Sequence, residues 1–93
     1  MHFLYILSSK TADRFYIGET KDVQQRLQDH IFHKYSKGFT KTANDWKIVL
    51  EVQLKNKEQA IFLEKFIKKM KSRKFIQKVI DDPEILNDIL KNK

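Results

Sequence analysis

Two tyrosines, an arginine, a histidine and a glutamate stand at intervals that could bring them together in one site. Tyr16 lies in the segment RFYIG, Arg26 follows ten residues later, and His30 comes four residues after Arg26. Tyr5 precedes this group and Glu64 follows it in a second helical segment. Phenol, guanidinium, imidazole and carboxylate groups exchange protons, bind anions and bind cations. A strand followed directly by a helix can hold several such groups around one point, so a site is expected here.

The positions of the charged members on their helices support this expectation. At 100° per residue, Arg26 lies about 60° and His30 about 20° from Val23 on the apolar stripe of the first helix. Glu64 lies about 40° from Ala60 on the second helix. An ionised group beside a core face is costly unless it is paired, hydrogen-bonded or bound to a metal. The alternatives are a structural ion pair between Arg26 and Glu64, and a partly buried His30 with satisfied hydrogen bonds.

Two strands and a helix would position the first half of this set. Alternating apolar residues predict strands at 3–7 and 14–18, close enough to pair as a hairpin. In these strands Tyr5 and Tyr16 could also be plain strand aromatics with hydroxyls at the sheet edge. Asp22 and Gln25 form a plausible capping box for a helix whose apolar stripe is Val23, Leu27 and Ile31, and which fades near His33.

The second half of the chain predicts one more strand and three helices. A basic, polar loop at 35–45 leads to a strand at 46–54. Asn56 can cap a helix at 57–70, whose predicted apolar face is Ala60, Leu63, Ile67 and Met70. A further helix is expected at 72–80, and Asp82 before Pro83 suits the start of a last one. The order β-β-α-β-α-α-α predicts an α/β (α+β) fold with a small, mainly antiparallel sheet of three strands and flanking helices.

The chain is expected to be one domain over residues 1–93, with a core at about 3–80 and a C-terminal helix at about 83–91. Its formal net charge is +7 and it contains no cysteine, which excludes disulfides and thiolate chemistry. Its apolar runs are far shorter than a membrane span, and no basic segment precedes the first of them. We therefore expect a cytoplasmic protein that does not enter a membrane.

The positive charge is concentrated in one segment. Residues 65–78 carry seven basic side chains and no acidic one, interleaved with apolar residues at helical spacing. A basic helix face of this kind favours contact with phosphate, and hence with nucleic acid. The alternative is a solvated face that keeps the protein in solution. The candidate nucleic-acid contacts are Lys65, Lys68, Lys69, Lys71, Arg73 and Lys74, with Lys21 added from the turn after the second strand.

Taken together, the order and spacing of these residues along the chain resemble the GIY-YIG nuclease domain. The resemblance covers residues 3–80 and rests on the blocks FLYIL, YIG, RLQDH, WKIVLEV and EQAIFLEKFIKKMKSRK. It implies a divalent-metal-dependent endonuclease that acts on DNA, directed by DNA structure in repair or recombination. In that reading Tyr5 or Tyr16 is the base or orients the water, its phenolate made accessible by nearby positive charge. Arg26 holds the scissile phosphate, His30 hydrogen-bonds phosphate or water, and Glu64 binds one Mg²⁺ or Mn²⁺ ion.

Three departures from the family pattern stand out. The first tripeptide is Phe3-Leu4-Tyr5 without a glycine, and Ile76 stands where some relatives have an asparagine. Glu19 follows Gly18 where several relatives carry a lysine, which Lys21 could replace.

These departures keep other functions open. The first alternative is a non-catalytic nucleic-acid-binding module that kept the fold, and the second is a small subunit that delivers protein partners to DNA. The sequence leaves open whether the chain forms a homodimer or binds another protein.

Overall fold

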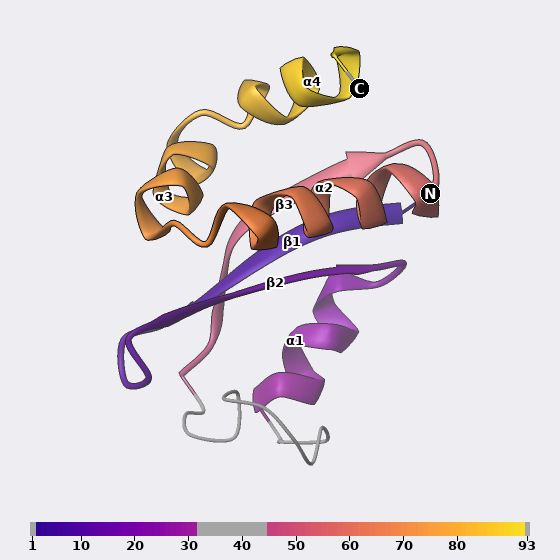
Figure 1. Ribbon diagram of the computed structural model, residues 1–93. Coiled ribbons are helices and arrows are strands. Elements are labelled where there is room, and N and C mark those ends of the chain that lie inside the picture. The colour runs from indigo at the N-terminus through magenta and orange to yellow at the C-terminus, as the bar shows by residue number, and fades with distance from the viewer. Residues whose placement is uncertain (1, 32–44, 93) are drawn as a thin grey trace.

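The computed structural model describes residues 2–31 and 45–92, apart from the side chains of His30 and Ile31. Three strands and four helices lie in these residues, in the predicted order (Figure 1). They are β1 (His2–Ser9), β2 (Arg14–Thr20), α1 (Val23–Ile31), β3 (Lys47–Leu54), α2 (Lys57–Met70), α3 (Arg73–Asp81) and α4 (Glu84–Lys91). The prediction of an α+β fold with this element order is confirmed.

The three strands form an antiparallel sheet in the order β2-β1-β3. The central strand is the first in the chain, and Tyr5 lies opposite Gly18 on β2 and opposite Glu51 on β3. Residues 4–7 of β1 are all buried. A strand that is covered on both faces needs an unbroken apolar run, and this explains why FLYIL lacks polar residues. Among the described strands β2 is an edge strand, so side chains on it can meet ligands.

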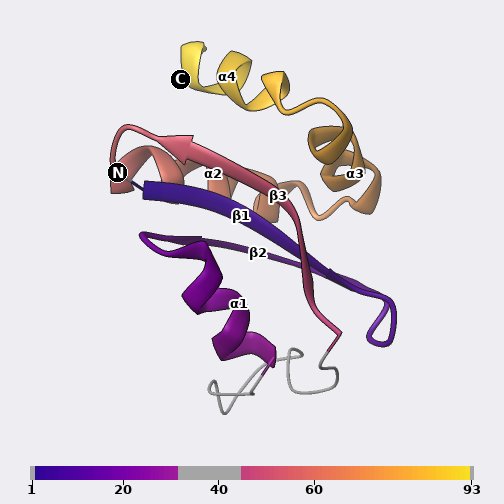
Figure 2. The ribbon, with the colours of Figure 1, turned by 180° about the vertical axis from the view of Figure 1, so that it is seen from behind.

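Helices cover both faces of the sheet. Leu4 and Ile6 pack in one apolar cluster with Leu63 and Ile67 of α2, together with side chains of α3 and α4. Tyr5 and Leu7 point to the other face and pack with Val23, Trp46 and Leu27. Seen from the front and from behind, α1 lies on one side of the strands and α2 to α4 on the other (Figures 1 and 2). Alternate residues of β1 thus point to opposite faces of the sheet.

Short polar side chains begin α1, α2 and α3, and those of α1 and α2 are the predicted ones. The side chain of Asp22 accepts a hydrogen bond from the backbone N–H of Gln25 at 3.1 Å, which starts α1 directly after β2. Asn56 accepts one from the N–H of Gln59 at 2.9 Å and starts α2. Ser72 does the same at α3. Each contact satisfies an N–H group that has no partner within the helix, so the helix starts are encoded locally.

Several predicted boundaries and faces differ from the structure. The strands β1 and β2 extend beyond the predicted 3–7 and 14–18, because edge-to-edge pairing continues to the ends of the hairpin. Trp46 is buried just before β3 and is not part of it. Met70 is 48% exposed, so its place on the apolar face is wrong. It is the last residue of α2, and the chain turns there through Lys71 in the left-handed region.

Other predictions fall outside the part of the chain that the structure describes. These are the fading of α1 near His33 and residues 35–44 of the predicted polar loop. For the residues that the structure does describe, no helix combines the length and the apolar character that crossing a membrane requires.

Candidate active site

Tyr5 and Tyr16 form the centre of the candidate site. Tyr5 is only 2% exposed, and its ring is stacked with that of Tyr16, with 6.3 Å between centroids and 30° between planes. The two residues come from adjacent strands, and Gly18 lies directly opposite Tyr5. Because Gly18 has no side chain, the Tyr5 ring can cross β2 toward the edge of the sheet. The glycine of the YIG segment therefore makes room for the tyrosine of the first strand.

Gly18→Ala should test this packing. A Cβ atom on Gly18 would lie 2.5 Å from Oη, 2.7 Å from Cζ and 2.9 Å from Cε1 of Tyr5. Alanine is normally the better residue inside a strand, but overpacking here should lower the free energy of unfolding by ~1–3 kcal/mol. Urea unfolding measures the change. In a Tyr5→Leu background the same substitution should cost much less, and an equal cost in both backgrounds would contradict the proposed clash.

The Tyr5 hydroxyl is electrostatically coupled to the other candidate groups. Burial raises the pKa of Tyr5 well above its ordinary value, and the nearby Tyr16, Glu64 and Glu19 raise it further. Arg26 lowers this pKa, but burial outweighs it. The prediction that positive charge makes a phenolate accessible is therefore wrong for Tyr5. At neutral pH this side chain is a neutral hydroxyl, which can donate or accept a hydrogen bond.

Arg26 is fixed at the start of α1, where that helix leaves the end of β2. Its side chain is partly buried, and its Nε atom donates a hydrogen bond to Oγ1 of Thr20 at 3.4 Å. The same Thr20 oxygen accepts a hydrogen bond from the backbone N–H of Asp22 at 3.1 Å. The buried Thr20 thus links the helix start to the arginine. This contact holds the guanidinium at the sheet edge near Tyr5.

Glu64 and Lys68 form the α2 side of the site. Glu64 is partly buried, and its Oε2 atom accepts a hydrogen bond from Nζ of Lys68 at 2.8 Å. The ammonium of Lys68 also lies 6.0 Å from the centre of the Tyr16 ring. The structure therefore gives Glu64 an ion pair one helical turn away, where the sequence suggested Arg26 as the alternative partner. A 21% exposed carboxylate at this place remains within reach of a ligand.

The predicted metal site rests on one carboxylate. In residues 2–31 and 45–92, no group of three or more histidine, cysteine, aspartate or glutamate side chains could hold a metal ion. A single carboxylate still fits Mg²⁺ or Mn²⁺, because such an ion keeps several waters and takes further oxygens from a phosphate. The backbone of His30 lies in α1, but its side chain lies outside the described part, so its predicted contact with phosphate stays a prediction.

His2 is a site residue that sequence reasoning missed. Its Nε2 atom contacts a carboxylate oxygen of Glu19, one of the residues at which the sequence departs from the expected family pattern. His2 is buried, and the pair lies at the end of the strands β1 and β2. The departure at Glu19 was the available signal. The sequence could not identify His2 as the partner of Glu19, because the two residues are 17 positions apart.

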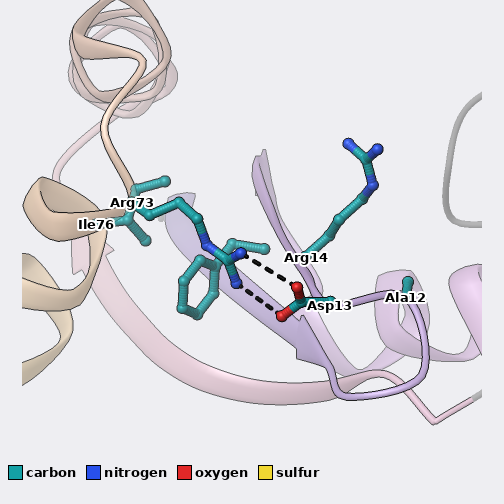
Figure 3. Close-up of a pocket in the computed structure, with 6 residues that line it drawn as sticks. Ala12, Asp13, Arg14, Arg73 and Ile76 are labelled. Atoms are coloured by element: carbon teal, nitrogen blue, oxygen red, sulfur yellow. Dashed lines mark hydrogen bonds and ion pairs between the residues drawn. The ribbon is translucent and has the colours of Figure 1, made fainter.

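The predicted nucleic-acid contacts divide into two groups. Lys65, Lys69, Lys71 and Lys74 are exposed around the end of α2 and the start of α3, as is Lys21 after β2. Lys68 is bound to Glu64, and Arg73 donates two hydrogen bonds to Asp13 at 3.1 and 3.4 Å. Figure 3 shows Arg73 reaching from α3 to the tip of the β1–β2 hairpin. Lys68 and Arg73 thus already hold acidic partners.

A comparison with protein families matches residues 1–78 to the model of the GIY-YIG catalytic domain. No curated protein and no solved structure gives a significant match. The matched range contains all three strands, α1, α2 and most of α3. It also contains Tyr5, Tyr16, Arg26, His30 and Glu64, the residues predicted to form the site.

Proposed function

The chain belongs to the GIY-YIG catalytic domain family, a nuclease-type domain, and from this we propose that it is a divalent-metal-dependent endonuclease acting on DNA. We further propose that residues 1–93 act as one domain and that DNA structure directs cleavage, in repair or recombination. One observation carries the assignment beyond the family. The buried Tyr5 hydroxyl lies within electrostatic range of Tyr16, Arg26 and Glu64, which come from β2, α1 and α2.

The residues divide the reaction among them. Hydrolysis of a phosphodiester needs an oriented water, stabilisation of charge on the non-bridging oxygens, and help for the leaving oxygen. In this proposal the neutral Tyr5 hydroxyl orients the water, and Tyr16, the other tyrosine of the predicted site, is the proposed general base. Arg26 contacts two phosphate oxygens through its planar guanidinium, and His30 hydrogen-bonds phosphate or water.

Glu64 is the proposed protein ligand of one Mg²⁺ or Mn²⁺ ion. When bound, such an ion neutralises charge on the phosphate and lowers the pKa of a bound water. In the structure the ammonium of Lys68 donates a hydrogen bond to one oxygen of this carboxylate. Lys68 is 53% exposed, so its side chain can swing into solvent when a cation binds Glu64. The proposal thus assigns Lys68 as a counter-ion of the metal-free site.

A second candidate function is a non-catalytic nucleic-acid-binding module. The observation that favours it is Glu19, which stands near the site in place of a lysine and contacts His2. A cleavage assay separates the two functions. Purified protein is incubated with labelled duplex, flap and branched DNA in Mg²⁺, Mn²⁺ or EDTA. Metal-dependent nicking supports the endonuclease, whereas binding without nicking on every substrate and with either ion supports the module.

The exposed lysines provide a test of the DNA-binding face. Replacing three exposed lysines around the α2–α3 junction by glutamine should weaken binding to every DNA and flatten its salt dependence. Each lost phosphate contact reduces the slope of log K against log salt by ~0.9 on duplex DNA. The variant carries Lys69→Gln, Lys71→Gln and Lys74→Gln, and a filter or polarisation assay in EDTA measures it. Lys68 stays intact, because it contacts Glu64.

The control removes the same charge from elsewhere on the surface. It replaces three other exposed lysines, at the ends of β3 and α4, and should leave the slope close to the wild-type value. These are Lys47, Lys55 and Lys91. If the two triple variants change the slope equally, the α2–α3 junction is not the DNA-binding face.

A further inference from the structure

A cavity lies beside the candidate active site, and half of its lining residues are cationic. Its volume is about 260 Å³, and it is lined by His2, Glu19, Thr20, Lys21, Arg26 and Lys57. The lining residues come from the start of β1, the end of β2 and the turn after it, α1, and the first residue of α2. Arg26 is shared with the candidate active site. The cavity therefore continues that site along the edge of the sheet.

The charges in this cavity suit an anion. Lys21, Arg26 and Lys57 contribute three positive charges, and Lys21 and Lys57 are exposed at its mouth. The one acidic group is Glu19, and it already contacts the buried His2. Lys57 opens α2, whose N-terminal backbone N–H groups add partial positive charge. An anion that enters the cavity from solvent would therefore face a net positive charge, because one carboxylate cannot neutralise three cations.

We propose that this cavity is a second phosphate subsite, which binds a phosphate next to the one that is cleaved. The inference rests on the proposed function, in which Arg26 contacts the cleaved phosphate. A strand that places one phosphate at Arg26 must continue along the protein, and this cavity begins at the same side chain. Lys57 is its principal new contact, because it lies outside the basic segment of residues 65–78 and lines the cavity with Arg26.

Glu19 sets the strength of this subsite. Its carboxylate repels phosphate, and the contact with His2 holds it against the buried end of β1. A lysine at this position would add a cation to the cavity, whereas the glutamate removes one charge from it. Glu19→Gln should therefore tighten DNA binding in EDTA several-fold. Weaker binding by this variant, with the fold retained, would contradict a phosphate in the cavity.

The test uses DNA duplexes in which a single phosphate is replaced by an uncharged methylphosphonate at successive positions. Binding is measured in EDTA for wild type, Lys57→Gln and Lys55→Gln. Lys55 is the matched control, because it is exposed two residues before Lys57, in the turn between β3 and α2, but does not line the cavity. We expect Lys57→Gln to weaken binding several-fold and to reduce the salt slope by ~0.9. We also expect that one methylphosphonate position which weakens DNA binding by wild type has no effect on DNA binding by Lys57→Gln.

The outcomes separate this inference from the proposed function. Loss of sensitivity at one phosphate in Lys57→Gln, but not in Lys55→Gln, supports the subsite whether or not the DNA is cut. Equal weakening by both variants, with no phosphate singled out, overturns it even if cleavage is intact. Circular dichroism and thermal unfolding confirm that both variants fold. Where wild type cleaves, the phosphate coupled to Lys57 should adjoin the cut, and a distant position would also overturn the inference.

Discussion

Glu64→Gln is expected to abolish cleavage with Mg²⁺ or Mn²⁺ while leaving the metal-free protein folded and able to bind DNA in EDTA. The substitution keeps the size of the side chain but removes the negative charge that binds the cation. Its ion pair with Lys68 joins residues one helical turn apart and is solvent-accessible. Such pairs contribute only ~0.3–0.5 kcal/mol to the free energy of unfolding. The free energy of unfolding without metal should therefore stay within ~0.5 kcal/mol of wild type or exceed it.

Glu58→Gln is the matched control for this experiment. Glu58 is an exposed carboxylate in the first turn of the same helix, and its removal should leave cleavage unchanged. Lys68→Gln separates the ion pair from the carboxylate, because it removes the counter-ion and keeps Glu64. We expect it to retain metal-dependent cleavage. A large loss of stability in Glu64→Gln, with cleavage preserved in the folded fraction, would instead make Glu64 a structural residue and favour the binding module.

Arg26→Lys is expected to slow cleavage by at least ~10²-fold with DNA binding in EDTA retained. Lysine keeps the positive charge but loses the planar pair of N–H donors that contacts two phosphate oxygens at once. Removal of one donor that stabilises a transition state costs about this factor. The variant also loses the contact from Nε to Thr20, so its charge is less well positioned. Single-turnover cleavage and thermal unfolding measure the two effects separately.

The control for Arg26 is Arg14→Lys, an equally conservative change at an exposed position at the start of β2. It should leave the cleavage rate close to that of wild type. Near-wild-type turnover by Arg26→Lys would show that the guanidinium of Arg26 does not contact the reacting phosphate. Arg26 would then be a structural residue that links α1 to the end of β2 through Thr20.

Much of this fold could be predicted because its signals are local. The unbroken apolar run of β1 encodes a strand covered on both faces, and alternation assigns Leu4 and Tyr5 to opposite sides. Asp22, Asn56 and Ser72 start helices through hydrogen bonds to residues three positions ahead. The family resemblance rests on the same kind of pattern, and its match to residues 1–78 confirms it.

The environment of each site residue was decided by tertiary structure. Burial of Tyr5 in the cluster between the sheet and α1 raises its pKa, which no pattern along the chain reports. The contact of His2 with Glu19 depends on the register of the β1–β2 pair.

The ion pair of Arg73 and the exposure of Met70 were also decided by tertiary structure. Arg73 could be placed in a basic segment from sequence, but its partner Asp13 is 60 residues away. Met70 fits the helical period of the apolar face and is exposed, because α2 ends there. The sequence by itself determined the elements, their order and the candidate residues through short-range periodicity and capping. Register, burial and long-range charge pairing determined what each residue contacts, because these depend on segments brought together only in the folded chain.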